Sequence, residues 1–364
     1  MGLTATKYKE TEAGLIPEDW EVKKLGEVLK IRHGRSQKEV EDKNGIYPIL
    51  GTGGLMGYAN KFLYDKESVL IGRKGTIDKP RYMSTPFWTV DTLFYSEIKT
   101  NIVAKVLFYN FQLIDWYSHN EASGVPSLNA SKIESIKISL PPTVNEQKAI
   151  AQVLTDTEEL IQALEKKTAK KKLIKKGTMQ KLLTPKKDWE MKSLGEVAEI
   201  YTGKKNNQDK VENGRYPFFV RSQIVESINT YSFDGEAILV PGEGNIGKIF
   251  HYINGKFDFH QRVYKISNFK DGYNGKYIYR YISEYFGMHA MENSVKATVD
   301  SLRLTTFEVF QIPFPPTFEE QILIAKILGD IDKEIENLEQ ELSKYQLVKQ
   351  GMLQQLITGK IRLV

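Results

Sequence analysis

The segment Asp19-Trp20-Glu21, with Leu25-Gly26-Glu27-Val28 behind it, recurs as Asp188-Trp189-Glu190, with Leu194-Gly195-Glu196-Val197 behind it. Tyr47-Pro48 returns at the same offset as Tyr216-Pro217. Each copy closes with a second shared segment, which reads Leu140-Pro141-Pro142-Thr143 and then Phe314-Pro315-Pro316-Thr317. The chain is therefore an internal duplication. Two similar modules with a pseudo-twofold relation suit a partner with two nearby sites, and duplex DNA is the commonest such partner.

Composition limits the class of protein. A chain of 364 residues is long enough for two or three domains with cores of their own. The lack of cysteine excludes disulfides and thiolate metal sites, and it fits a cytoplasmic location. We expect no membrane partner, because no apolar run approaches about 18 residues. The net charge of +5 permits nucleic-acid binding but does not by itself indicate it.

Each copy divides into a strand-rich part and a long helix. Short β-like runs broken by Gly, Asn and Pro predict the α+β class with an antiparallel or mixed sheet. These runs are 47–50, 68–71 and 88–95 in the first copy, and 216–220, 237–240 and 257–266 in the second. We therefore expect a first globular domain at 1–144, a long helix at 145–185, a second globular domain at 186–318 and a second long helix at 319–364.

The two long helices are expected to form an antiparallel coiled coil. Their apolar residues recur at a period close to 3.5, which favours supercoiling, and about 38 residues each would span roughly 57 Å. Residues 166–187 carry only lysines as charged groups, whereas 319–341 are mostly acidic. Antiparallel pairing places opposite charges together at both ends. The alternative is that the lysine run is a solvated helix face or contacts phosphate.

The stretch 242–248, Gly-Glu-Gly-Asn-Ile-Gly-Lys, matches two nucleotide-binding patterns. Both G-x-G-x-x-G and G-x-x-x-x-G-K need a helix directly after the loop, so that backbone N–H groups face a phosphate. The apolar and aromatic run 249–255 instead predicts a strand that ends in a turn, and Ile249 replaces the hydroxyl that would bind Mg²⁺. The sequence therefore argues against a nucleotide site.

The 242–248 loop and its counterpart in the first copy, 72–79, both contain glycine, and they fit a DNA backbone better than a nucleotide. Glycine lets a backbone approach a surface closely, and we align Ile71-Gly72-Arg73 with Pro241-Gly242-Glu243. The candidate DNA contacts in these loops are Arg73, Lys74, Lys79, Asn245 and Lys248. The alternative is a tight hairpin that needs its glycines only for the backbone. An acidic Glu243 in this place faces away from phosphate or reads cytosine.

Base-reading side chains are expected in two further pairs of loops. Arg or Lys suits guanine, and Asn or Gln suits adenine. After the Leu-Gly-Glu motif the candidates are Arg32, Arg35, Ser36, Gln37 and Lys38 in the first copy, and Lys204, Lys205, Asn206 and Asn207 in the second. After the Tyr-Pro pair they are Arg221, Ser222 and Gln223, opposite Gly51-Thr52-Gly53-Gly54. The loops differ between the copies while the framework matches, which is expected of two domains that read different target sequences. The alternative is that exposed loops diverge in sequence whatever their function.

Over essentially its whole length the chain resembles the specificity (S) subunit of type I restriction-modification systems. The resemblance rests on the doubled D-W-E…L-G-E-V and P-P-T…E-Q segments, on Gly72-Arg73-Lys74-Gly75 and on Ser123-Gly124-Val125-Pro126-Ser127-Leu128. It implies two target-recognition domains, each reading one half of a split DNA sequence, and a helical spacer that sets the gap.

The resemblance also implies that DNA recognition and catalysis lie on different subunits. The chain would be a non-catalytic DNA-binding subunit with no cofactor of its own. Two methyltransferase (M) subunits would bring S-adenosylmethionine and methylate adenine, which requires base flipping. Restriction (R) subunits, where present, would bring ATP-driven cleavage with Mg²⁺. We expect the M subunits to contact helix faces outside the coiled coil, at Gln147, Gln152, Glu159 and Gln321.

Two other classes of function compete with this one. A coiled-coil scaffold, or an orphan adaptor without an active partner complex, would share the helices. An NTP-dependent enzyme would use the 242–248 loop. The histidines are scattered without metal-binding spacing, and there is no G-x-S-x-G nucleophile motif, so the sequence offers no catalytic site.

Overall fold

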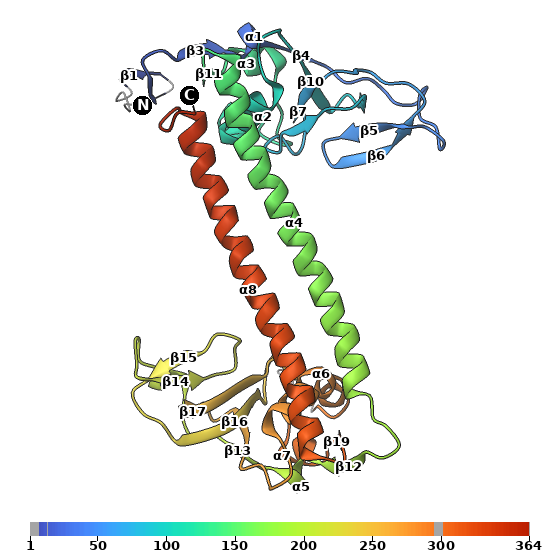
Figure 1. Ribbon diagram of the computed structural model, residues 1–364, viewed down its shortest axis with the longest axis vertical. Helices are drawn as coiled ribbons and strands as arrows, with labels where there is room; N and C mark the ends of the chain where they lie inside the picture. The colour runs from blue at the N-terminus through green and yellow to red at the C-terminus, as the bar shows by residue number, and fades with distance from the viewer. Residues whose placement is uncertain (1–6, 13, 295–300, 364) are drawn as a thin grey trace. The chain divides into compact units, whose positions relative to one another are not determined.

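The computed structural model describes residues 7–12, 14–294 and 301–363 (Figure 1). The chain forms two compact units. Unit 1 consists of Met1–Lys166 and Gln340–Val364, and unit 2 consists of Lys167–Glu339. Each unit contains one globular domain together with a segment of both long helices.

Unit 2 is built on a six-stranded sheet. Its order is β13 (Glu199–Thr202), β18 (Val263–Ser267), β16 (Phe233–Pro241), β17 (His251–Phe259), β14 (Tyr216–Phe219) and β15 (Glu226–Ile228). All neighbours are antiparallel except β14 and β17, which run parallel. Alternate residues of β16 enter two different cores. Ile238 and Val240 lie in the cluster with Tyr277 and Phe286 of α6 (Gly275–Glu292), whereas Leu239 lies in a separate cluster.

Unit 1 has the same strand order, but it is divided between two sheets. One contains β4 (Leu29–Arg32), β10 (Leu93–Ile98), β7 (Ser68–Gly72) and β8 (Arg81–Met83), and the other contains β6 (Gly54–Ala59), β5 (Tyr47–Gly51) and β9 (Trp88–Thr89). The parallel pair β5–β9 corresponds to β14–β17. Two short strands, β8 and β9, thus stand where unit 2 has the single strand β17. Helix α2 (Ala104–Leu113) packs on this framework as α6 does in unit 2.

The repeated Leu-Gly-Glu-Val motif forms one helical turn in each unit. These turns are α1 (Leu25–Val28) and α5 (Leu194–Val197), and their Leu and Val side chains are buried. The Oε2 atom of Glu27 accepts a hydrogen bond from the backbone N–H of Lys24 at 2.5 Å, and Glu196 accepts one from Ser193 at 2.7 Å. The motif is therefore a short capped helix, in which the carboxylate satisfies an N–H group that the helix itself leaves free.

Smaller elements complete both units. They are the hairpin β1 (Tyr8–Thr11) and β2 (Gly14–Pro17), the pairs β3 (Glu21–Lys24) with β11 (Lys137–Leu140) and β12 (Glu190–Ser193) with β19 (Gln311–Phe314), the helices α3 (Ala130–Ser135) and α7 (Leu304–Glu308), and the 3₁₀ helices η1 (Trp116–His119) and η2 (Asn207–Asp209). The β3–β11 and β12–β19 pairs join the start of each globular domain to its end.

The long helices are α4 (Val144–Leu183) and α8 (Phe318–Ile357), and they pack together antiparallel, as predicted. In unit 1 the ion pair Glu158–Lys349 joins them at 2.7 Å. In unit 2 the lysine run meets acids of α8, with Lys171–Glu334, Lys172–Glu339 and Lys175–Asp332 each at 2.6 Å. Three lysines of this run are therefore paired with acids of the second long helix.

Two of the side chains that we expected on free helix faces are in fact buried. Gln147 and Gln321 are only 2% and 3% exposed. The amide of Gln147 accepts from the Val103 backbone N–H and donates to the Pro141 carbonyl. Gln321 accepts from the Asn274 backbone N–H in the same way, and it donates to the Gly272 carbonyl. The glutamine of each Glu-Gln motif thus fastens a long helix to the loop before α2 or α6, and the prediction that these two residues contact a partner is wrong.

Three strand predictions also need correction. The run 257–266 is not one strand, because it contains the end of β17, a turn at 261–262 and most of β18. The run 88–95 is not one strand, because β9 and β10 are separated at Val90–Thr92, where the Leu93 N–H bonds to the Val90 carbonyl at 3.0 Å. The expected turn at Asn254-Gly255 lies inside β17, opposite Glu236 and Gly235 of β16. Pairing with a neighbouring strand overrides the local turn preference of Asn-Gly.

Within the described residues, no helix has both the length and the apolar character needed to cross a membrane.

Candidate nucleic-acid interface

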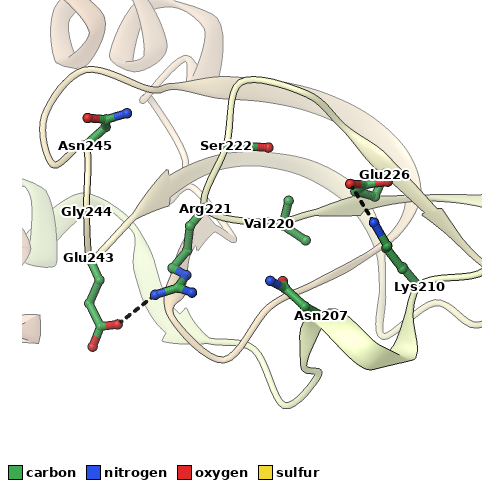
Figure 2. A pocket seen from close by; sticks show the side chains of 9 residues that line it. All are labelled: Asn207, Lys210, Val220, Arg221, Ser222, Glu226, Glu243, Gly244 and Asn245. Atoms are coloured by element: carbon green, nitrogen blue, oxygen red, sulfur yellow. Dashed lines mark hydrogen bonds and ion pairs between the residues drawn. The ribbon is translucent and has the colours of Figure 1, made fainter.

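Three segments of unit 2 converge on a surface cavity of about 470 Å³ (Figure 2). The residues that line it are Asn207, Lys210, Val220, Arg221, Ser222, Glu226, Glu243, Gly244 and Asn245. They come from η2 and its end, from β14–β15 and the turn between them, and from the loop after β16. Four residues predicted to contact DNA are brought together here, namely Asn207, Arg221, Ser222 and Asn245.

Each charged side chain of this cavity is paired with a group of opposite charge. Arg221 Nη1 lies 3.3 Å from Glu243 Oε2, and Lys210 Nζ lies 3.2 Å from Glu226 Oε1 (Figure 2). The other carboxylate oxygen of Glu243, Oε1, lies 3.2 Å from Arg262 Nη1. With the side-chain amides of Asn207 and Asn245, the cavity offers both donors and acceptors. This composition suits the edges of bases better than a phosphate group.

A buried histidine contacts the backbone of the connection between β14 and β15. His251 Nε2 lies within hydrogen-bonding distance of the Ser222 carbonyl oxygen, at 3.2 Å. Burial lowers the pKa of His251, and burial together with the nearby Arg221 lowers the pKa of His260. Both imidazoles are therefore held in the neutral form at neutral pH.

Unit 1 has the same two loops in contact, with different side chains. Gly75 and Gly244 have φ values of 86° and 84°, a backbone conformation that glycine adopts without strain. Arg81 takes the role of His251, since it donates to the Gly51 carbonyl at 3.0 Å and to the Thr52 carbonyl at 2.8 Å. The framework that places the loops is thus shared, while the groups that it presents are not.

A second cavity, this one in unit 1, contains the predicted residues Arg73 and Lys74. It measures about 270 Å³ and is also lined by His33, Glu121, Ser127, Asn129 and Ser131, among others. Arg73 Nη1 donates to the Asp91 carbonyl at 3.3 Å, whereas the side chain of Lys74 is exposed. This cavity is more basic than that of unit 2.

The hydrogen bonds correct our alignment of the two loops by one position. The Arg73 N–H bonds to Thr92 O as the Gly242 N–H bonds to Arg262 O, both at 2.8 Å. Lys74 then pairs with Ser127 as Glu243 pairs with Ser301. Glu243 therefore corresponds to Lys74 and not to Arg73. The alignment was wrong because it matched Gly72 to Gly242, whereas strand pairing matches Gly72 to Pro241.

The remaining candidates of unit 1 lie outside these two cavities. Arg32 pairs with Glu97 at 2.8 Å on the sheet. Arg35, Ser36, Gln37 and Lys38 follow Gly34, where a side chain would clash because a Cβ atom would lie 2.0 Å from the Val90 carbonyl oxygen. Arg35, Ser36 and Lys38 are exposed and Gln37 is half-buried. Lys79 is exposed between β7 and β8.

In unit 2 the corresponding residues precede η2. Gly203 meets the Phe259 carbonyl as Gly34 meets Val90, which fixes the start of this loop. The Lys205 carbonyl accepts from the Gln261 N–H at 2.8 Å, and the Asn206 N–H donates to Asp209 at 2.7 Å. Lys204 is exposed, as are Gln223 in the β14–β15 connection and Lys248. Residues 246–248 form a turn and no helix follows them, so the geometry of a phosphate-binding loop is not present.

Several residues of these surfaces were not found from the sequence. Lys210, Glu226 and Arg262 were missed because their role depends on partners distant in the chain. Exposed aliphatic residues also stand at equivalent places beside both turns, namely Leu55 and Met56 in unit 1 and Ile224 and Val225 in unit 2. Comparing the two copies position by position would have found this second group.

Comparison with known proteins agrees with these features. The family model described as the type I restriction modification DNA specificity domain matches residues 17–175 and again 186–344. The MjaVIII specificity subunit of Methanocaldococcus jannaschii is 27% identical, over 98% of this chain and 96% of the relative. The EcoDI specificity subunit of Escherichia coli is 28% identical, over 47% of this chain and 37% of the relative.

A solved structure shares the fold. The crystal structure of a type I restriction-modification S subunit from M. genitalium superposes with a TM-score of 0.72, at 16% identity, and covers 97% of this chain and 99% of that one.

Proposed function

Because the chain belongs to the family of type I restriction-modification DNA specificity domains, whose model matches it twice, we propose that each of its globular domains reads one half of a bipartite DNA target. The observation that carries this proposal is the pair of equivalent loop frameworks. Both units bring the β5–β6 or β14–β15 turn against a glycine loop, and each pair presents different side chains. One scaffold with two sets of readers fits a target with two different halves.

The candidate residues divide into two kinds of contact. Exposed cations suit the phosphate backbone, which gives affinity without sequence information. In this group we place the exposed Arg35, Lys38, Lys79, Lys204 and Lys248, together with the half-buried Lys205. Base reading falls to Asn207, Arg221, Ser222 and Asn245 in unit 2 and to Arg73 and Lys74 in unit 1. Further candidates that line neither cavity are Arg32, Ser36, Gln37, Asn206 and Gln223.

The helix pair would serve as the spacer and as the docking surface for two methyltransferase subunits. Gln152 and Glu159 remain candidates for that contact because both are exposed on α4. Catalysis and its cofactors, S-adenosylmethionine for methylation and ATP with Mg²⁺ for restriction, are assigned to the partner subunits. This chain contributes recognition and geometry.

A binding titration tests the proposal. The chain in complex with its methyltransferase subunits is mixed with labelled duplex DNA, and affinity is measured at several salt concentrations. We expect affinity to fall steeply with salt, as counterions are released from the phosphates. The same titration is run with the methyltransferase subunits alone. A coiled-coil scaffold that does not touch DNA would add no salt-dependent affinity to theirs, and that result would exclude the proposal.

A further inference from the structure

We propose that Glu243 is a positioning residue that holds Arg221 to read a guanine in the half-site bound by unit 2. The inference rests on the proposed function and adds to it a base and the pair of residues that would select it. The geometry that points to it is a single carboxylate that pairs with two guanidinium groups, that of Arg221, which Figure 2 shows, and that of Arg262.

The pair leaves most of the Arg221 donors free. Glu243 Oε2 contacts Nη1 of Arg221 at 3.3 Å. A guanidinium has five N–H donors in a planar fork, so an edge that can bind two acceptors remains. Guanine presents two acceptors, O6 and N7, on its major-groove edge, and a bidentate arginine is the commonest specific contact to it. The Arg221 side chain is 41% exposed, so it can reach a ligand.

Glu243 is itself held in place by the backbone. It forms a bridge with Ser301, next to the hydrogen bonds from Gly242 N–H to Arg262 O and from Leu302 N–H to Gly242 O, both 2.8 Å. Its side chain is 23% exposed, about half as much as that of Arg221. A carboxylate on a fixed backbone restrains a long side chain, which lowers the entropy lost when arginine binds.

The second arginine makes an acid tolerable beside DNA. Arg262 Nη1 pairs with the other oxygen of Glu243 at 3.2 Å, so the three groups together carry one net positive charge. The cavity's other cation, Lys210, is matched by Glu226. A site intended for phosphate would not keep two carboxylates among its cations. A base edge, which carries both donors and acceptors, is the better partner.

Unit 1 provides an internal control. Leu50 pairs with Thr89 as Phe219 pairs with Phe259, so Thr52 stands where unit 2 has Arg221. Lys74 stands where unit 2 has Glu243. Neither member of the pair is present in unit 1, so changes to it should affect one half of the target only.

The test is a selection from a pool of randomised duplex DNA by the complex of the full chain with its methyltransferase subunits. The wild type, Arg221→Ala, Glu243→Ala and Glu243→Gln are compared, with Asp330→Asn as a control. Asp330→Asn removes an exposed ion pair with Lys326 on α8, outside the cavity. Thermal unfolding followed by circular dichroism checks that every variant folds.

We expect one guanine in one half-site to lose its preference in Arg221→Ala, with discrimination falling roughly tenfold or more. Glu243→Ala should weaken the same position, and Glu243→Gln, which can still accept a hydrogen bond, should restore most of it. The other half-site and the Asp330→Asn motif should be unchanged.

Three outcomes would overturn the inference. A split motif whose guanines all survive Arg221→Ala would remove the inference and leave the proposed function intact. Equal loss in both halves upon Glu243→Ala would show a general structural role. A wild-type complex that selects no motif would remove the proposed function, and the inference with it.

Discussion

Arg362 joins the C-terminal segment of unit 1 to two distant parts of the chain. Its guanidinium binds both oxygens of Glu146 at the start of α4, and it lies 2.8 Å from Asp19 of the Asp-Trp-Glu motif. Glu146 is 2% exposed. The hydrogen bonds to Arg362 lower the pKa of Asp19, and those to Glu146 raise the pKa of Arg362. A carboxylate this deeply buried depends on its partner.

Arg362→Ala should therefore destabilise unit 1 by about 3 kcal/mol, because it leaves Glu146 buried and unpaired. The measurement is the urea midpoint of the transition of unit 1. The matched control is Lys186→Ala, which breaks the corresponding pair of unit 2, with Glu320. The Lys186 side chain is 61% exposed, so we expect that loss to stay below about 1 kcal/mol. Equal effects of the two changes would contradict the role given to Arg362.

The buried histidines of unit 2 make its stability depend on pH. Burial lowers the pKa of both His251 and His260 below the ordinary value of 6.5. The unfolded chain then binds protons more readily, so stability is complete above about pH 6.5 and is lost as pH falls through the folded values. Unfolding of unit 2 in denaturant at pH 7.5 and pH 5.5 should show the loss. His251→Gln should reduce it, and an unchanged pH dependence in that variant would contradict this assignment.

At the scale of elements, the helix pair was the part most accessible to sequence reasoning. Apolar period and opposed charge runs are local patterns, and they predicted both α4 and α8 and their antiparallel pairing. The functions of Gln147 and Gln321 were not predictable, since their partners are backbone groups of loops far away in the chain. In the sheets, the break between β9 and β10 and the passage of β17 through Gly255 depend on neighbouring strands, which a single segment does not reveal.

The candidate site shows the same limit. Arg221, Ser222, Asn207 and Asn245 were chosen by residue type and loop position, and the fold brings all four to one cavity. Other choices, such as Lys79 and Lys248, lie outside it. Which of several polar loops converge is decided by sheet order, and sheet order was not part of the sequence prediction.

Asp332 of α8 makes ion pairs with two different helices of unit 2. It pairs with Lys175 of α4 at 2.6 Å and also with Arg280 of α6. Lys172, by contrast, makes a single pair with Glu339, and its side chain is 57% exposed. Asp332→Asn should lower the free energy of unfolding of unit 2 by about 1–2 kcal/mol, and Lys172→Ala by less than about 0.5 kcal/mol. Denaturant midpoints measure both, and the reverse order would contradict the network.

At the scale of the whole molecule, the N-terminal and C-terminal segments of the chain contact each other within unit 1. The Tyr8 hydroxyl donates to the Lys360 carbonyl at 3.0 Å, and Gly359 packs on Pro17 and Trp20. Unit 2 reaches the same arrangement through the continuous chain from α4 to the second Asp-Trp-Glu motif. A covalent connection in one copy is thus replaced by contacts between the two terminal segments in the other.

If the helices set the gap between half-sites, lengthening both should lengthen the gap. Insertion of one heptad at facing positions of α4 and α8 keeps the apolar register and adds about 10 Å of helix. At roughly 3.4 Å per base pair, the selected target should gain about three undefined base pairs. Selection from randomised duplex measures the gap. An unchanged gap in a folded, DNA-binding variant would show that the helices do not set it.

The most direct test of the central claim is to sequence N6-methyladenine in genomic DNA from cells that carry the partner methyltransferase, with and without this chain. We predict that methylation appears only with the chain, within a motif of two short defined halves separated by a fixed undefined gap. A single uninterrupted motif, or methylation that is the same without the chain, would contradict the account that each globular domain reads one half of the target.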